Sequence, residues 1–285
     1  MRHDDFYYDL CSWIENKLEA PLSLHEIAKK AGYSKWYLQR QFKSKMGVTL
    51  GKYIHNRRIT RAALALRYSS LKISEIFTLS GFDSQQSFTR AFKRHFGITP
   101  AVYSHHEYTQ FKGFQKLIVH PFTCSHNHFL TKRKSPLINA TLAVRTNIET
   151  LININQSLEN GRALITEFLI NTSERKKFTM IANIAREDVR SHSILQELSL
   201  SAYDDPRLLE TDDTVECLTF PFSGSAGEFL FFRSYVYYNL VPEIDISIKG
   251  TTDFFEGEIC NSGNETLIQG CLYIPVGTSE NSLNN

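Results

Sequence analysis

The sequence has no apolar run that approaches the roughly 20 residues of a membrane-spanning helix, so its 285 residues contain no predicted transmembrane segment. Its first residues, Met1 to Phe6, are too polar to resemble a secretory signal. The five cysteines are scattered, without the paired spacing of a disulfide framework. An odd, scattered set in a long chain is typical of a reducing compartment, and we therefore expect a cytoplasmic protein.

Common enzyme motifs are also missing. The sequence contains no nucleophile elbow, no Gly-rich phosphate loop and no HExxH helix. Four potential metal ligands would share one face of a strand, and they are His120, Cys124, His126 and His128. Because tetrahedral sites usually recruit ligands from more than one element, we expect neither a metal nor a cofactor. The sequence therefore favours a protein that is not an enzyme.

The charge is divided unevenly along the chain, although the net charge is only +2. Residues 1–116 contain 19 Lys+Arg and 9 Asp+Glu, a net charge of +10. Residues 117–285 contain 13 Lys+Arg and 21 Asp+Glu, a net charge of −8. A basic surface can serve solubility alone, but a basic half joined to an acidic half indicates a nucleic-acid-binding module attached to a second domain.

The basic half contains an internal repeat. Residues 24–33 align with residues 73–82 at an offset of 49 residues, and one extra residue near Asp83 moves the offset to 50. The match then pairs Leu38 with Phe88, Phe42 with Phe92, Gly47 with Gly97, Thr49 with Thr99 and Tyr53 with Tyr103. Apolar, Gly and aromatic residues in register to this extent indicate two copies of one structural unit.

Each copy has the pattern of a helix–turn–helix. In the first copy, Ser23 and Glu26 form a capping box that predicts a helix starting at residue 24. Gly32 supplies the tight turn, and Ser34 caps a second helix that runs to about residue 46. In the second copy, Lys72 replaces the first capping serine, and the second helix starts from Asp83 or Ser84.

The second helix of each copy divides into an apolar and a polar face at 100° per residue. The polar faces consist of Trp36, Gln39, Arg40 and Lys43 in the first copy, and Gln86, Thr89, Arg90 and Lys93 in the second. Arg and Gln side chains can read guanine and adenine in the major groove, and Lys suits phosphates. A solvated surface is the alternative, but an outward tryptophan and the repetition of the face favour DNA binding.

One helix is predicted between the copies, over residues 50–67, with a length of roughly 27 Å at 1.5 Å per residue. A stiff spacer of that order can present two recognition helices to successive major grooves, about 34 Å apart, without a dimer. Arg57, Arg58 and Arg61 on this helix are candidate phosphate contacts. Intramolecular salt bridges are an equal alternative for each of them.

These residues resemble the AraC/XylS family of bacterial transcription activators, and within it the branch of MarA, SoxS and Rob. The stretches that carry the resemblance are PLSL (21–24), AGYSKWYLQR (31–40), YI (53–54), GFDSQQSFTRAFK (81–93) and GITPAVY (97–103). The resemblance implies a seven-helix domain with two helix–turn–helix units joined by a long helix, which binds double-stranded promoter DNA as a monomer. It adds Gln85 to the contacting residues, and it implies target genes for multidrug and stress tolerance and RNA polymerase as a partner.

From about residue 111 the helical periodicity gives way to short strands, predicted at 117–130, 137–145, 178–187, 215–223, 228–235, 254–260 and 266–276. Helices are expected over 150–170 and 236–246, and a polar loop over 204–213. This pattern predicts an α+β domain. We therefore expect a multidomain protein with an all-α DNA-binding domain (1–110), a linker (111–120) and an α+β domain (121–285).

The order of the two halves and the closing LYIPV (272–276) resemble a GyrI-like module, a class that often binds amphipathic or cationic small molecules. Cys271 departs from the pattern, because a glutamate commonly precedes this closing strand. Four residues are candidates for an aromatic, acidic effector pocket, and they are Glu228, Tyr235, Tyr237 and Tyr238. Ordinary strand tyrosines are the alternative. The acidic half could instead bind a protein, or carry small-molecule hydrolase or transfer chemistry.

Overall fold

The structure is a computed structural model, and it describes residues 3–69, 71–106, 108–118, 129–138, 142–147, 177–186, 193–202, 208–244, 246–250, 252–262 and 265–277. The chain divides into two compact units. The helical unit comprises Met1–Arg67, Leu71–His105 and Gly113–Pro121, and the sheet unit comprises Tyr68–Ser70, His106–Lys112 and Phe122–Asn285. Among the described helices, none combines the length and apolar character that crossing a bilayer requires.

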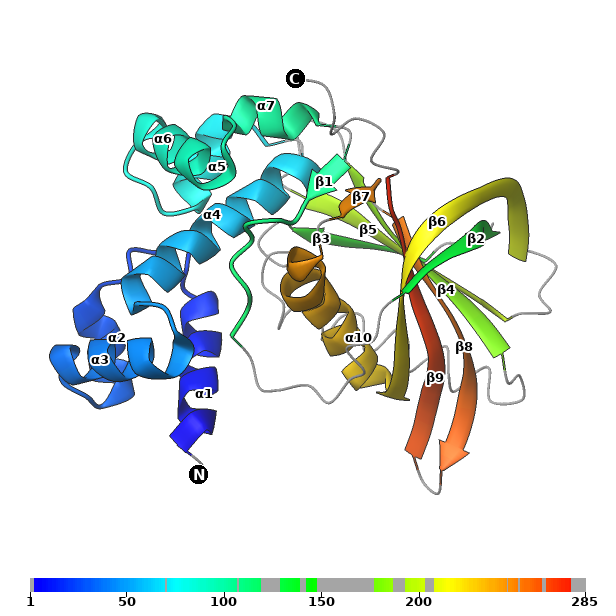
Figure 1. The fold of residues 1–285 in the computed structure, drawn as a ribbon, viewed down its shortest axis with the longest axis horizontal. Coiled ribbons are helices and arrows are strands. Elements are labelled where there is room, and N and C mark those ends of the chain that lie inside the picture. The colour runs from blue at the N-terminus through cyan, green and yellow to red at the C-terminus, as the bar shows by residue number, and fades with distance from the viewer. Residues whose placement is uncertain are drawn as a thin grey trace. The chain divides into compact units, whose positions relative to one another are not determined.

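The first half of the helical unit contains α1 (His3–Glu15), α2 (Leu24–Ala31) and α3 (Lys35–Met46), drawn in blue in Figure 1. The predicted capping box is confirmed, since Ser23 N donates to Glu26 Oε2 at 2.8 Å and Glu26 N donates to Ser23 Oγ at 3.2 Å. The bonds that Ser23 N and Ser23 Oγ donate to the Glu26 carboxylate, each 2.8 Å long, hold the pKa of Glu26 below its usual value. Ser34 caps α3 as predicted, and Gly32 adopts the left-handed conformation (φ 70°) that ends α2.

The second half contains α4 (Leu50–Tyr68), α5 (Ile73–Leu79), α6 (Gln85–Phe96) and α7 (Pro100–His105). The predicted long helix between the copies is therefore confirmed and extends one residue further than expected. Ser84, one of two candidates, is the cap of α6, and its hydroxyl accepts from Ser87 N at 3.2 Å. The two helix–turn–helix units are α2–α3 and α5–α6.

The core of the first half is formed by side chains from α1, α2 and α3 together with the start of α4. Tyr7, Ile14, Leu38, Phe42 and Tyr53 are each fully buried in one apolar cluster. In the second half, a chain of aromatic contacts connects α6 with α7 and the segment after it. It runs through Phe82, Phe88, Phe92, Phe96, Tyr103 and Phe114. Helices α3 and α6 thus bury their apolar faces, and this burial leaves their polar faces outward.

The sheet unit contains a seven-stranded antiparallel sheet in the order β2-β6-β9-β8-β4-β5-β3. The strands are β2 (Phe129–Ile138), β3 (Leu142–Asn147), β4 (Lys177–Arg186), β5 (Ser193–Ala202), β6 (Leu208–Ser225), β8 (Thr252–Ser262) and β9 (Glu265–Pro275). β1 (Tyr108–Gln110) and β7 (Ser247–Lys249) form a separate antiparallel pair. Figure 1 shows the long strand β6 in yellow, paired with β2 on one side and β9 on the other.

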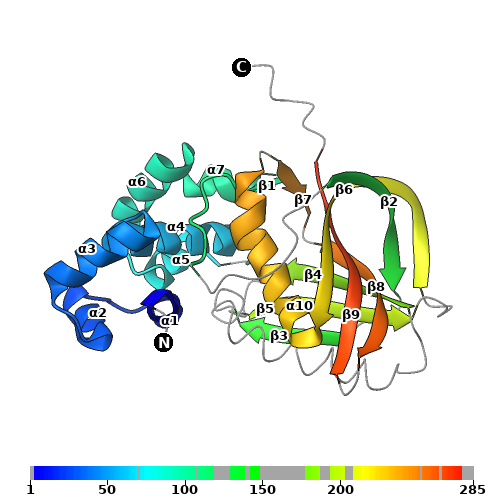
Figure 2. The same ribbon diagram turned by 60° about the horizontal axis from the view of Figure 1, so that its bottom comes forward.

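Helix α10 (Ala226–Tyr235) packs on one face of this sheet, beside β6 and β9, as both Figure 1 and Figure 2 show. The strand predicted at residues 228–235 is therefore wrong. Phe229 and Phe232 of α10 contact Phe222 of β6 at ring-centroid distances of 5.3 and 4.9 Å. Helical spacing places these two aromatic side chains on the buried side, and this packing overrides their strand propensity.

Other expectations for the acidic half are also corrected. The predicted loop at 204–213 is wrong for its described part, because β6 already begins at Leu208. The expected helix near 236–246 is a π-helical turn, η1 (Val236–Leu240), followed by a 3-10 turn, η2 (Val241–Glu243), both continuing α10. The helix expected at 150–170 and the His/Cys cluster of residues 120–128 lie outside the described residues.

The segment expected to be a linker has buried contacts in its described part. Phe111, in the sheet unit, lies 5.7 Å from the ring of Tyr237 and is 2% exposed. Phe114, in the helical unit, packs on Phe96 at 5.8 Å, and Gln115 N donates to Thr60 Oγ1 at 2.9 Å. Only Lys112 and Gly113 separate the two buried phenylalanines, so little of the described linker is free chain.

Candidate nucleic-acid interface

The polar face of α3 is exposed to solvent. Its exposed residues are Trp36, Gln39, Arg40 and Lys43. On the opposite side, Leu38 and Phe42 are fully buried. Trp36 is 67% exposed, so most of its side chain is accessible on this face.

Trp36 and Arg40 also contact each other. The Arg40 guanidinium lies over the Trp36 ring, 5.3 Å from its centroid, one helical turn away along α3. This contact restricts both side chains at the centre of the exposed face. A guanidinium that is already oriented loses less conformational entropy when it forms bonds to a base.

Helix α6 presents a matching face. Its exposed residues are Gln85, Gln86, Arg90 and Lys93, and Thr89 is half-buried. Phe88 and Phe92 are fully buried beneath them. Of the nine predicted contact residues on α3 and α6, eight are therefore exposed and Thr89 is half-buried.

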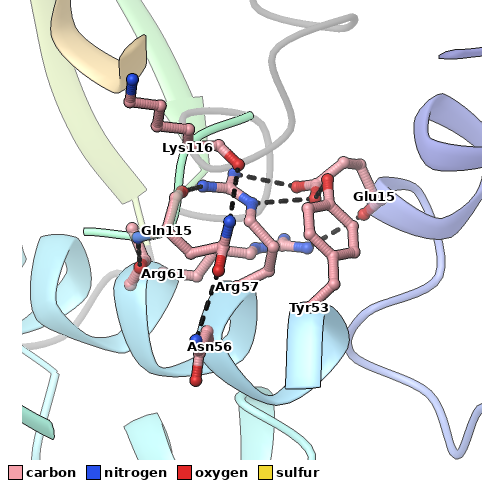
Figure 3. Close-up of polar contacts among 8 residues, drawn as sticks. Glu15, Tyr53, Asn56, Arg57, Arg61, Gln115 and Lys116 are labelled. Carbon is pink, nitrogen blue, oxygen red and sulfur yellow. Dashed lines mark hydrogen bonds and ion pairs between the residues drawn. The ribbon is translucent and has the colours of Figure 1, made fainter. Parts of the chain in front are cut away.

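The arginines of α4 are placed differently. Arg57 is fully buried, and its Nε and Nη2 donate to the Glu15 carboxylate at 2.8 and 2.9 Å. Its Nη1 donates to the main-chain oxygen of Gln115 at 2.8 Å, and Tyr53 Oη donates to Glu15 at 2.9 Å (Figure 3). These contacts use the donors of Arg57 inside the protein, so the predicted phosphate contact of Arg57 is wrong.

The predicted phosphate contact of Arg61 is wrong for the same reason. It is 6% exposed, and its Nη2 donates to Glu19 Oε1 at 2.6 Å while Nη1 donates to Glu15 O at 3.1 Å. Arg58 donates to three main-chain oxygens. Arg57 and Arg61 therefore form the salt bridges of the alternative prediction, whereas Arg58 bonds Leu18 O, Ala20 O and Gly81 O. Sequence spacing does not reveal these distant acceptors.

The two remaining faces have the chemistry of major-groove readers. Arg40 and Arg90 can donate two parallel bonds to guanine, and Gln39 and Gln86 can both donate and accept at adenine. Lys43 and Lys93 each follow one of these arginines by three residues, about one helical turn, and suit phosphates. The same set of residue types on the second helix of both units makes these faces the candidate interface.

The four candidate effector residues of the sheet unit have different surroundings. Glu228 is the third residue of α10 and accepts from Ser225 N at 2.7 Å, a capping role. Tyr235 lies seven residues later, roughly 10 Å along the axis, and stacks near Phe231. Tyr238 is 8% exposed and thus part of the interior.

Tyr237 belongs to a buried polar cluster that the sequence did not predict. Its hydroxyl donates to Asp253 Oδ2 at 2.8 Å, and Arg233 Nη2 donates to the same oxygen at 2.6 Å. Asp253 is 2% exposed, so this carboxylate depends on Arg233 and Tyr237. The 20-residue separation of Arg233 and Asp253, on a helix and a strand, leaves no signal in the sequence.

No group of three or more His, Cys, Asp or Glu is placed to hold a metal ion within the part of the chain that the structure describes. The cysteines of β6 and β9 are not activated. Burial raises the pKa of the Cys217 thiol to about 12, and burial also raises the pKa of Cys271. Both thiols therefore stay protonated near neutral pH, which argues against a cysteine nucleophile here.

Comparison with known proteins gives the class. A family model described as a helix-turn-helix domain matches residues 27–106. The Right origin-binding protein of Escherichia coli K12 is 41% identical over 151 residues, which are 53% of this chain and 52% of that protein. The regulatory protein SoxS of the same organism is 45% identical over 105 residues, 37% of this chain and 98% of SoxS. The TetD protein of transposon Tn10 in Escherichia coli is 50% identical over 101 residues, 35% of this chain and 73% of TetD.

The fold and the twin recognition faces define a double helix–turn–helix protein with an added antiparallel-sheet unit. The chain belongs to the AraC/XylS family, and it is a Rob-like member. The alignment spans about half the length of the first of these relatives, the Right origin-binding protein.

Proposed function

We propose that this protein is a sequence-specific DNA-binding transcription activator, with α3 and α6 as its recognition helices. Each helix enters the major groove, and the two grooves lie on one face of an asymmetric site of roughly two helical turns. One chain then covers the whole site, so the protein binds as a monomer. Residues on the two helices read bases, and lysines nearby contact phosphates.

One observation carries this proposal. The same exposed combination of Arg, Gln and Lys occurs on the second helix of two structurally repeated units, above buried Phe or Leu side chains. A solvated surface does not need an exposed tryptophan or a repeated arrangement. A protein that binds two adjacent major grooves of DNA needs both a contact face and a second copy of it.

The experiment is selection of bound duplexes from random DNA, followed by titration of the selected site with salt. We expect one asymmetric consensus bound one-to-one, with affinity falling steeply as salt rises because phosphate contacts release counterions. A palindromic site bound by two chains would contradict the monomer model. Equal affinity for all sequences would contradict sequence-specific readout.

The likeness to SoxS and to the Right origin-binding protein supports a finer proposal about biology. We infer target promoters of stress and multidrug-tolerance genes, RNA polymerase as the protein partner, and a cytoplasmic location at the nucleoid. Expression profiling after deletion of the gene, together with pull-down of polymerase on promoter DNA, tests these assignments. Unchanged transcript levels of such genes under stress would contradict the first of them.

For the sheet unit we propose an effector role, either binding of an amphipathic small molecule in a GyrI-like manner or binding of a protein. Thermal unfolding of the full chain with cationic amphiphiles distinguishes the two, because a ligand that binds the native state raises the melting temperature. No shift with any amphiphile favours a protein partner. The raised pKa of the Cys271 thiol opposes the alternative of an enzymatic sheet unit, because a protonated thiol is a weak nucleophile.

A further inference from the structure

Arg58 contacts the main chain of both halves of the helical unit. Its Nε donates to Leu18 O at 2.8 Å, and its Nη2 donates to Ala20 O at 2.8 Å, both in the turn that follows α1. Its Nη1 donates to Gly81 O at 3.2 Å, in the turn between α5 and α6. One guanidinium near the middle of α4 therefore joins the first helix–turn–helix half to the second.

On the side of the first half, the acceptors are fixed relative to α3. Leu18 is 1% exposed and belongs to the same buried cluster as Leu38 and Phe42 of α3. A displacement of the Leu18 carbonyl would therefore disturb the packing under the first recognition helix. The two bonds to Leu18 and Ala20 therefore fix the position of the guanidinium relative to α3.

On the side of the second half, the contact is close. Gly81 has a φ of 67°, and a Cβ at this position would lie 2.8 Å from Arg58 Cζ. The equivalent glycine of the first unit, Gly32, has a φ of 70°, but a Cβ there would have nothing within 4 Å. The next residue, Phe82, packs on Phe88 of α6 at 5.4 Å, so the turn and α6 move together.

A guanidinium is planar and holds its donors in a fixed geometry, so three simultaneous bonds define the position of one half relative to the other. We propose that Arg58 fixes the separation and relative rotation of α3 and α6, and thereby the base-pair spacing that the protein accepts between the two halves of its DNA site. This inference rests on the proposed function, in which both helices enter major grooves.

The spacing of the two half-sites is a strict geometric quantity. One inserted base pair moves the second groove by about 3.4 Å and rotates it by roughly 35° about the DNA axis. Two rigidly joined recognition helices must then lose contacts or deform the DNA. Two loosely joined helices can follow the change. Selectivity for spacing therefore reports on the junction between the halves, separately from the contacts that each half makes.

The test uses the full chain and its selected site, together with versions in which one base pair is inserted or deleted between the half-sites. At fixed salt, we expect the unmodified protein to lose at least about tenfold in affinity for each altered spacing, the size of one poor base contact. Arg58→Lys keeps the charge but not the fork of donors. This variant should bind the selected site more weakly than the unmodified protein does. Its own affinity should then fall by less than about threefold when the spacing is altered.

The two glycines provide a matched pair of variants. Gly81→Ala and Gly32→Ala place the same side chain at nearly the same φ (67° and 70°), but only the first meets Arg58. Gly81→Ala should flatten the spacing dependence as Arg58→Lys does, whereas Gly32→Ala should leave it steep. The proposal would be overturned if Arg58→Lys and Gly81→Ala each weakened binding by the same factor at every spacing. The dependence of affinity on spacing would then be as steep as in the unmodified protein. Circular dichroism identifies a variant that does not fold, and the other variant then carries the test.

A second measurement does not need DNA. Labels attached through non-cysteine chemistry at Ser44 of α3 and Arg94 of α6, both exposed, report the distance distribution between the helices. Arg58→Lys should broaden this distribution, and an unchanged distribution would overturn the proposal whether or not DNA binds. If the unmodified protein binds no sequence preferentially, the proposed function fails, while this measurement still decides the role of Arg58.

Discussion

The buried Arg57 guanidinium and the Glu15 carboxylate form a two-bond ion pair that connects α4 to α1. The pair joins Nε to Oε1 at 2.8 Å and Nη2 to Oε2 at 2.9 Å. The Arg57 side chain is fully buried, and that of Glu15 is 12% exposed. Since both charges have lost most of their water, each depends on the other for solvation.

Removing one partner should therefore destabilise the protein strongly. Arg57→Met leaves the Glu15 carboxylate buried without its cation, and we expect the free energy of unfolding of the helical unit to fall by about 3–5 kcal/mol. Urea denaturation measures this change. Arg40→Met, at an exposed arginine of α3, should change it by less than about 0.5 kcal/mol. Equal effects of the two substitutions would refute the assignment of Arg57 to the interior.

The two kinds of DNA contact should separate in a second experiment. Arg40→Ala should weaken binding to the selected site by about 1–3 kcal/mol and relax the preference at one base pair. Lys43→Ala should weaken binding similarly on all sequences and lower the salt slope by about one. Binding of both variants is measured on the selected site and on random DNA. If Arg40→Ala weakens both equally, Arg40 contacts phosphate and not a base.

Tryptophan fluorescence gives a direct test of the α3 face. Trp36 is 67% exposed, whereas Trp13 packs against the core of the first half. Binding of the selected duplex should change the emission of the protein because it covers Trp36. Trp36→Phe should abolish that change and Trp13→Phe should preserve it. A signal that persists in Trp36→Phe would place the DNA away from this side of α3.

We expect the stability of the protein to depend on pH through His55. Burial, followed by Arg94, His95 and Arg58, lowers the pKa of His55 below 6.5 in the folded protein. The folded state disfavours the charged form of His55. Its contribution to the free energy of unfolding is therefore complete above about pH 6.5, and this stability is lost as the pH falls through the lower pKa of the folded state. His55→Gln should flatten the unfolding free energy over this range.

The last prediction concerns the sheet unit. Tyr237→Phe removes a hydrogen bond to the buried carboxylate of Asp253, and we expect the stability of the ligand-free unit to fall by about 1–3 kcal/mol. Thermal and urea unfolding measure the change. Should Tyr237 serve an effector pocket instead, the substitution would leave the ligand-free protein unchanged and reduce only the shift that a ligand produces.

The helical unit could be predicted in detail because its signals are local. Ser23, Glu26 and Ser34 specify helix starts through bonds to residues three positions away, and the sequence contains both partners. The repeat then transfers each assignment to the second copy, where Ser84 acts as Ser34 does. For the recognition faces, helical periodicity alone separates inner from outer residues.

The arginines of α4 show where this reasoning stops. Periodicity could not decide between phosphate contacts and salt bridges, because the partner of Arg57 lies 42 positions away on α1. Helix α10 is a different case. Its aromatic residues favoured a strand, although Ser225 and Glu228 carry the same capping spacing that identified α2 correctly. The signal was present, and propensity obscured it.

The two turn glycines have a consequence for how the repeated units can diverge. At Gly32 only the left-handed backbone restricts the residue, and asparagine can adopt that conformation. At Gly81 the guanidinium of Arg58 occupies the space that any side chain would need. After a duplication, the first turn can therefore accept asparagine in place of glycine, while any side chain at the second turn must also displace the guanidinium of Arg58.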